Sequence, residues 1–406
     1  MNSNQHPAAR DQLGTRAVVL LAVASAIVTA NAYYIHPIIG RVAESFGVSA
    51  GLIGAVPAFN QIALALGVLL LLPLGDRMTN RTLVALCLSA QVLALLAMAT
   101  VQRYALFVAA STLLGFFTIT PYLLPAYASK RVDGTRLGFV TALLTTGVVF
   151  GVQFSRLGSG VIAEQLGWRA VYWIAAALMA CAVVALPLLM GPEAPLHRDR
   201  REPYAKLLLS LIRLPGRFPD VMVSGLIQGL SFAIFLAMWM GIGLHLTGPR
   251  LQLGTDIVGY LAAASAIGLM TTPRLGRWAD GLGAEGARIR MAVAQFTAVA
   301  SLALASYDWR LLIVPVVATA VSGPLIDITG RMTLLNRAPE IRTRLMSLYI
   351  TLMFLGGGFG SWSGTLAYDA LGWWGTVGLC LSLSSIACLL ALHQHRRAVN
   401  AAAHPV

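Results

Sequence analysis

The stretch GVVFGVQFSRLGSGVIAEQLGW, residues 147–168, decides the fold. It is apolar over most of its length, as a membrane-spanning helix is, yet it carries Arg156 near its middle. Residues four apart lie on one face of a helix, and small residues on such a face let a second helix come close. Small residues recur here at every fourth position: Gly147, Gly151, Ser155 and Ser159.

A second stretch, residues 356–373, repeats the pattern in GGGFGSWSGTLAYDALGW. Gly151, Glu164, Leu166, Gly167 and Trp168 correspond, 205 positions later, to Gly356, Asp369, Leu371, Gly372 and Trp373. This offset is close to half of the 406-residue chain, so the repeat indicates two similar halves.

The composition indicates a protein solvated by lipid. Hydrophobic residues make up 57% of the chain and charged residues 11%, against roughly a quarter charged in soluble domains. The net charge of +13 lies in short clusters between apolar runs, which is a topology signal and not a nucleic-acid-binding surface. The four cysteines lie in apolar runs without a CxxC pair, so we expect no disulfide, metal site or cofactor.

Twelve apolar stretches are each long enough to cross the hydrocarbon layer of a bilayer. They lie at about 17–39, 50–74, 82–100, 104–127, 138–163, 170–190, 221–246, 256–273, 291–306, 310–330, 346–369 and 374–392. Pro121 and Pro125 should kink the fourth. We therefore predict an all-α integral membrane protein with twelve transmembrane helices in two pseudo-symmetric six-helix bundles, 1–190 and 220–406, joined by a cytoplasmic linker, 191–219.

The distribution of basic residues predicts the orientation. Of the 29 arginines and lysines, 23 fall in loops on the side of the two termini and five in the opposite loops, with Arg156 inside a span. Basic loops stay in the cytoplasm, so both termini are expected inside the cell.

Twelve spans in two similar halves, with a basic central loop, resemble the major facilitator superfamily. The turn LPLGDRMTNR, residues 72–81, is similar to the loop between the second and third spans of that family, and GRWADGLG, residues 276–283, is its second copy. NAYYIHP, residues 31–37, and residues 147–168 resemble bacterial drug–proton antiporter-like efflux permeases, although Gly151-Val152 replaces that group's Gly-Pro pair. The resemblance implies a monomeric carrier in a bacterial inner membrane that exports a small organic molecule in exchange for protons.

The two repeated turns are candidates for a conformational latch, because an acidic residue at a helix end beside arginines can clamp neighbouring helix ends. The alternative is a set of solvated loop charges. The candidate residues are Asp76, Arg77, Arg81, Gly276, Asp280 and Gly283.

Arg156 is the leading candidate for substrate binding. A charged side chain in the hydrocarbon zone costs at least ~2.5–3.5 kcal/mol, so it should face the bundle interior and have a partner. The alternative is a structural arginine satisfied by carbonyl groups or by Glu164. Further polar and aromatic side chains could line the same cavity, although tyrosines at a span end are also typical of the membrane interface. These candidates are Asn31, Tyr33, Tyr34, Gln61, Phe235 and Trp239.

Two residues are candidates for proton coupling. Asp327, near the cytoplasmic end of the tenth span, is the best carboxylate, but Arg331 lies one turn further on and could simply pair with it. His36 titrates in the right range, but could lie at the outer interface.

The motifs exclude most other functions. The chain has no GxxxxGK[ST] loop to bind a nucleotide and no HExxH or GxSxG motif of an enzyme. We therefore expect a secondary active transporter, with an importer or symporter of a small anion or metabolite as the alternative. A membrane-embedded sensor is the other class, and the lack of a large soluble domain speaks against it.

Overall fold

The computed structural model describes residues 13–403 except 130, 133, 192–203, 205–213, 267, 269–274, 276–277, 280, 307 and 336–338. Most of the predicted linker, and Gly276 and Asp280 of the predicted latch, therefore lie outside the described residues. The part of the chain that is described contains helices and no β-strand.

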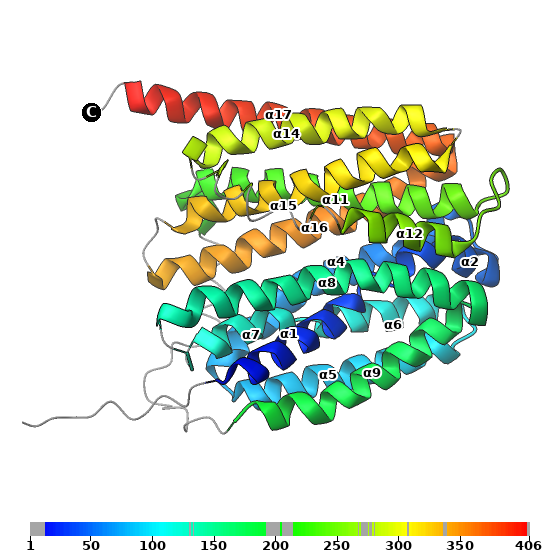
Figure 1. Ribbon diagram of the computed structural model, residues 1–406, viewed down its shortest axis with the longest axis horizontal. Coiled ribbons are helices and arrows are strands. Elements are labelled where there is room, and N and C mark those ends of the chain that lie inside the picture. The colour runs from blue at the N-terminus through cyan, green and yellow to red at the C-terminus, as the bar shows by residue number, and fades with distance from the viewer. Residues whose placement is uncertain are drawn as a thin grey trace, which may run out of the picture.

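The helices form two bundles that lie one above the other in Figure 1. The first contains α1 (Thr15–Ala30), α2 (Ile35–Phe46), α3 (Ala50–Ile53), α4 (Ala55–Leu71), η1 (Leu72–Asp76), α5 (Asn80–Thr100), α6 (Tyr104–Phe117), α7 (Thr120–Ser129), α8 (Gly134–Leu166) and α9 (Trp168–Leu189). The second contains α11 (Pro219–Thr247), α12 (Thr255–Ser265), α14 (Ala284–Ser301), η3 (Leu302–Ser306), η4 (Trp309–Leu312), α15 (Ile313–Leu335), α16 (Pro339–Leu371) and α17 (Trp373–Ala403).

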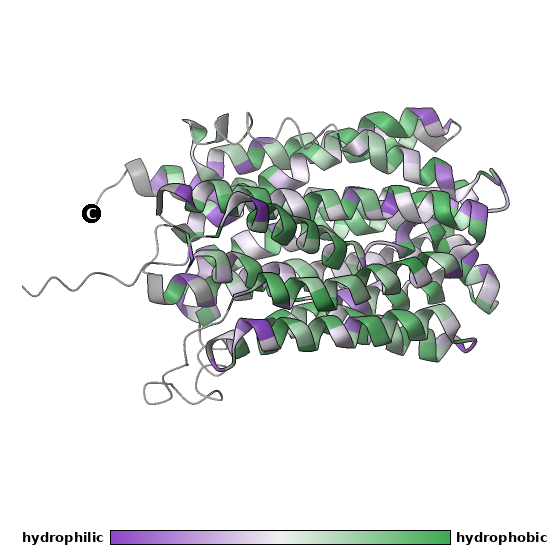
Figure 2. Ribbon diagram, turned by 60° about the horizontal axis from the view of Figure 1, so that its bottom comes forward, coloured by the Kyte–Doolittle hydropathy of each residue, from purple (hydrophilic) through white to green (hydrophobic). Residues whose placement is uncertain are grey.

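Eleven segments within the described residues are long and apolar enough to cross a membrane. The expected eighth span corresponds to α12, whose continuation includes residues outside the described part of the chain. Apolar residues cover the lengths of the helices and polar ones gather toward both ends (Figure 2). The fold is thus the predicted all-α membrane fold with two six-helix bundles.

The start of α1 and the end of α17 lie at one end of the helix array, here called the terminal end (Figure 1). The opposite end, here called the far end, holds two equivalent turns. Gly167 joins α8 to α9 with φ of +83°, and Gly372 joins α16 to α17 with φ of +60°. Glycine adopts this left-handed region without steric cost, so the repeated Leu-Gly-Trp of the sequence is a repeated sharp turn.

The first and fourth spans are broken helices. The first was expected at 17–39, but it ends as α1 at Ala30, turns through residues 31–34 and continues as α2 to Phe46. The fourth breaks between α6 and α7. Pro37 and Pro121 fall in the first turns of α2 and α7, where a missing backbone N–H leaves no helix hydrogen bond unmade.

The predicted small-residue face brings two pairs of helices into backbone contact. A Cβ on Gly151 of α8 would lie 2.3 Å from the carbonyl oxygen of Ala26 in α1. A Cβ on Gly360 of α16 would lie 2.2 Å from that of Ala233 in α11. The two halves therefore use glycine in the same way to seat α8 on α1 and α16 on α11.

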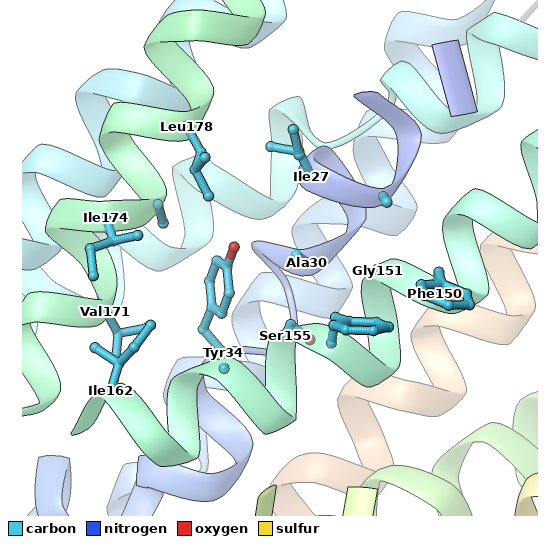
Figure 3. Close-up of a pocket in the computed structure, with 14 residues that line it drawn as sticks. Ile27, Ala30, Tyr34, Phe150, Gly151, Ser155, Ile162, Val171, Ile174 and Leu178 are labelled. Carbon is cyan, nitrogen blue, oxygen red and sulfur yellow. The ribbon is translucent and has the colours of Figure 1, made fainter. Parts of the chain in front are cut away.

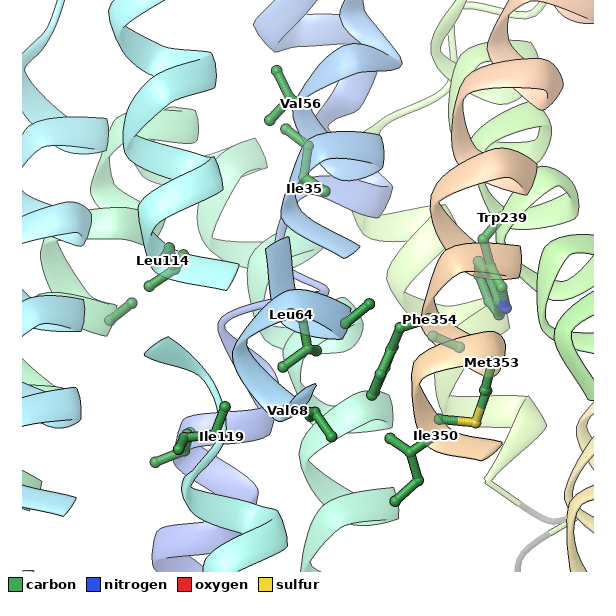
Figure 4. Packing of buried hydrophobic residues seen from close by; sticks show 14 of the residues in the cluster. Ile35, Val56, Leu64, Val68, Leu114, Ile119, Trp239, Ile350, Met353 and Phe354 are labelled. Carbon is green, nitrogen blue, oxygen red and sulfur yellow. The ribbon is translucent and has the colours of Figure 1, made fainter. Parts of the chain in front are cut away.

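The two bundles meet along an apolar seam in which α16 packs against α4, α8 against α12, and α11 against α2. Buried residues of α4, such as Leu64 and Val68, face Ile350, Met353 and Phe354 of α16 (Figure 4). This seam positions the centre of α8, and with it Arg156, between the bundles.

We predict that Gly151→Ala destabilises the protein by about 1–3 kcal/mol, because the new methyl group meets backbone that cannot move away easily. Gly138→Ala, on the same helix with nothing within 4 Å of its Cβ, is the matched control and should leave stability unchanged or slightly raised. The midpoint of thermal unfolding of the two purified variants measures this. Equal midpoints would show that α1 and α8 are not in close contact.

Candidate functional site

Arg156 of α8 is fully buried between the bundles and is held by neutral partners. Its Nε donates to Nδ1 of His36 (3.0 Å), and its Nη1 donates to Oε1 of Gln153 (2.9 Å). Gln153 lies one turn earlier on α8, and its Nε2 donates in turn to Oγ of Ser265 in α12. The arginine is therefore linked to both halves of the molecule through amide, imidazole and hydroxyl groups.

Three aromatic rings surround the guanidinium. Its central carbon lies 4.5 Å from the ring centre of Trp239, 4.7 Å from that of Phe235 and 5.2 Å from that of Tyr33. Trp239 and Phe235 lie one turn apart on α11, whereas Tyr33 lies in the turn between α1 and α2. Contacts of this kind are worth about 2 kcal/mol or more when desolvated, so the rings offset part of the cost of burying the charge.

His36 is held in one tautomer by this arrangement. Because Nδ1 accepts a hydrogen bond from Arg156, the proton of the neutral ring is on Nε2. That Nε2 is buried and has no hydrogen-bond partner in the structure. His36 also meets the ring of Tyr33 edge-on at 5.3 Å. His36 is thus part of the buried centre and not of the outer interface.

The charge of Arg156 has no carboxylate to balance it among the described residues. Glu164, which was the alternative partner, lies two turns further along α8 and instead pairs with Arg41 of α2. Nη2 of Arg156 is buried and makes no hydrogen bond. The site therefore retains an unneutralised cation with a free donor.

A second buried arginine, in contrast to Arg156, donates hydrogen bonds from both of its terminal nitrogens. Arg288 of α14 donates to Oγ of Ser224 (2.9 Å), to the carbonyl oxygen of Thr329 (2.6 Å) and to the side-chain oxygen of Gln394. The sequence had placed Arg288 in a loop, but α14 begins at Ala284 and buries it. Its partners belong to the second half alone, which indicates a structural role.

Two carboxylates join the halves at the far end. Oε2 of Glu164 accepts from the backbone N–H of Thr255 (2.9 Å), at the start of α12. Oδ2 of Asp369 accepts from Oγ of Ser49 (3.2 Å), the residue that caps α3. Glu164 and Asp369 are equivalent positions of the repeat, so each half places an acid at a helix N-terminus of the other, where the helix dipole favours it.

Three of the predicted lining residues lie away from Arg156. Asn31 donates from Nδ2 to Oε1 of Gln91 (3.0 Å) in α5, inside the first bundle. Tyr34 points to the other side of the turn, into an apolar cavity of about 270 Å³ between α1, α8 and α9 (Figure 3). Gln61 of α4 is fully buried, and neither polar atom of its side chain has a hydrogen-bond partner in the structure.

Asp327 is engaged in an ion pair. Nε of Arg331 donates to both of its carboxylate oxygens, at 3.0 and 2.9 Å, so the i,i+4 pairing that was the alternative is present. The hydroxyl of Tyr349 donates to its backbone carbonyl oxygen (3.2 Å).

The predicted latch is only partly within the described residues. Asp76 ends η1, and the guanidinium of Arg77 lies over the ring of Tyr204 at 5.5 Å. Tyr204 lies within the predicted linker, and burial raises the pKa of its hydroxyl above the ordinary value, against a smaller lowering by Arg77. Arg81 is exposed near the start of α5, and Gly283 precedes α14 with φ of +75°.

The structure adds Gln153 and Ser265 to the predicted set. Gln153 could have been found from the sequence, because an amide one turn from an arginine inside a span is suited to pair with it. Ser265 carries no such signal, since only the packing of α12 on α8 brings it near. Across the described residues no group of three or more His, Cys, Asp or Glu side chains could hold a metal ion.

This arrangement can bind and release a solute between two halves, but it contains no nucleophile poised beside a base. Its chemistry is hydrogen bonding, charge and aromatic contact in a buried place between the two bundles.

Comparisons with known proteins show which transporters this chain is similar to in sequence. The chain is 26% identical over 387 residues to the uncharacterized transporter YgaY of Escherichia coli O157:H7, which covers 93% of this chain and 94% of the relative. It is 26% identical over 233 residues to the multidrug resistance protein MdtG of Serratia proteamaculans, about half of each chain.

Solved structures show the same fold. The nucleoside transporter NupG matches with a TM-score of 0.70 at 16% identity, over 93% of this chain and 97% of that one. A bacterial homologue of the human lysosomal transporter Spinster, inward-facing and occupied, matches with a TM-score of 0.73 at 12% identity, over 95% and 97%. Residues 21–337 match the Major Facilitator Superfamily as a family. The chain therefore belongs to the Major Facilitator Superfamily and is a secondary transporter of a small solute, not an enzyme.

Proposed function

We propose that the protein carries a small organic solute out of the cell, in exchange for protons, through a central site at Arg156. The observation that supports this is the buried cation itself, which lies between the bundles with only neutral partners. A residue that costs several kcal/mol in a bilayer and pairs with no acid is a functional-site candidate.

In this proposal the two bundles rock about the seam and expose the site to each side in turn. The bonds of Glu164 and Asp369 close the far end in the present state. We also propose that the Asp76 and Asp280 turns, with Arg77, Arg81, Gly276 and Gly283, latch the terminal end when that side closes.

The basic loops favour a cytoplasmic position for both termini, so the far end would face the periplasm of a bacterial inner membrane. We propose bundles at 1–190 and 220–406 around a linker at 191–219, working as a monomer. Tyr33, Trp239 and Gln61 would line the solute pathway, and Asn31 and Tyr34 would support it from the first bundle.

His36 is the proposed coupling group. A proton on Nδ1 would end the hydrogen bond from Arg156 and place two cations side by side, so protonation and the present position of Arg156 exclude each other. Arg156 and Tyr33 are the titratable groups that meet His36 within the described residues. Asp327 already has Arg331 as a partner and is the second candidate.

Export is supported by the name of the MdtG relatives, which are multidrug resistance proteins. The absence of an acid beside Arg156 in the described site favours the alternative, an importer or symporter of a small anion or metabolite. Reconstituted vesicles with an imposed pH gradient separate the two, because the solute moves against the proton flux in one case and with it in the other.

We predict that Arg156→Gln abolishes transport while leaving the unfolding midpoint unchanged or raised, because the variant loses a buried charge that no acid neutralises. Arg288→Gln is the matched variant. It should lower stability by about 2–3 kcal/mol, because it removes charge-assisted hydrogen bonds. Transport in vesicles and thermal unfolding are measured on both. Loss of stability in Arg156→Gln with transport intact would make Arg156 structural.

For coupling, we predict that transport by His36→Gln no longer follows an imposed pH gradient, whereas transport by Asp327→Asn still does. Glutamine keeps an acceptor for Arg156 but does not titrate. The measurement is solute flux in vesicles at several values of the pH gradient. The opposite result would assign coupling to Asp327.

The far-end closure predicts that Glu164→Ala, which removes the acceptor for the Thr255 N–H, exposes the seam. A lost helix cap costs about 1 kcal/mol, which shifts an opening equilibrium about fivefold. Thr365 is fully buried against Gly54 of the first half, so a cysteine at this position reports on opening of the seam. In a chain without its native cysteines, Thr365→Cys should react with a maleimide about fivefold faster when Glu164 is replaced. Thr376→Cys, buried inside the second half, is the control and should not change.

A further inference from the structure

The buried centre leaves two polar atoms unsatisfied, and both are hydrogen-bond donors. One is Nη2 of Arg156, and the other is Nε2 of His36, which carries the ring proton because Nδ1 accepts from Arg156. The two side chains are bonded to each other, so their free donors belong to one small site. Buried donors without partners need an explanation, and a ligand with acceptor atoms supplies one.

The two acceptors that hold the guanidinium are already in use and are not available to a cationic solute. Oε1 of Gln153 already accepts from Arg156, and Nδ1 of His36 does as well. No carboxylate of the described chain lies within 4 Å of the guanidinium. A substrate ammonium group would therefore meet a like charge without compensation.

The side chains around the two donors include flat apolar rings. The rings of Trp239, Phe235 and Tyr33 surround the guanidinium. Tyr33 belongs to a buried apolar group with Ala32 and Leu236, against which Phe235 packs. One cation among three rings balances a single negative charge, whereas a second negative charge would stay unneutralised in an apolar place.

We propose that the cargo is an organic monocarboxylate with a flat apolar body. The carboxylate accepts a charge-assisted hydrogen bond from Nη2 of Arg156, and the Nε2–H of His36 is the second donor that the substrate can use. The apolar body takes its place among the aromatic walls. The inference rests on the proposed central site and names the substrate class, and it holds for either direction of transport.

The test uses three probes of similar size that carry a negative charge, no charge and a positive charge: benzoate, benzamide and benzylammonium. Binding to the purified full-length protein is measured by calorimetry at a fixed pH. We expect benzoate to bind at least about tenfold more tightly than the other two, and Arg156→Gln to weaken benzoate binding about 10- to 100-fold. Arg310→Gln, the same substitution at an exposed arginine, should change nothing.

Variants at His36 distinguish a hydrogen bond that His36 donates to the carboxylate from simple packing of its ring. His36→Gln keeps a donor and should retain most of the benzoate affinity, whereas His36→Phe keeps only a ring and should lose about tenfold. Equal affinity in both variants would remove His36 from the anion site.

Two results overturn the proposed class: benzamide or benzylammonium binding as tightly as benzoate, or benzoate binding unchanged in Arg156→Gln. Neither result contradicts the proposed transport function, because flux of any solute in vesicles would still support it. Conversely, tight Arg156-dependent benzoate binding without flux in vesicles would support the class and overturn transport.

Discussion

A positive charge in the middle of a lipid-solvated protein is the constraint on which the rest of the structure depends. Arg156 cannot reach water or a carboxylate in this state, so the fold surrounds it with the neutral acceptors of His36 and Gln153 and with three ring faces. These partners come from α2, from α8 itself, from α11 and from the turn between α1 and α2. The position of the charge therefore requires that both bundles be assembled around it.

The duplication explains the scaffold, whereas the site lies where the two copies differ. The repeat places Gly151 and Gly356, Gly167 and Gly372 at equivalent points, and their contacts and turns are equivalent in space. The position that corresponds to Arg156 is Ser361, whose hydroxyl donates to the carbonyl oxygen of Gly357 in its own helix. A symmetric frame thus holds an asymmetric centre, with the charge on one half and the aromatic residues of α11 on the other.

The same symmetry organises the far end. Glu164 and Asp369 are equivalent, and each meets the N-terminal turn of a helix in the opposite bundle. Because these bonds join the halves only at their far ends, they resist separation there while the small-residue contacts keep each bundle rigid. Closure at one end and a buried site in the middle are the two features that a carrier with alternating access needs.

Periodicity and composition by themselves determined the helices, the duplication and the place of Arg156 inside a span, because apolar length and residue spacing are local properties of the chain. The Leu-Gly-Trp turns are also a local property, because glycine adopts the left-handed backbone conformation that such a turn needs. What only the tertiary structure decided is which side chains meet. Tyr33 and Tyr34 are neighbours in sequence, yet one faces the guanidinium and the other an apolar cavity, because the break after α1 turns them apart. Glu164, on the same helix as Arg156, is taken by Arg41 and α12 instead. Such partners lie 91 or more positions apart, and only the packing of helices brings them within hydrogen-bond distance.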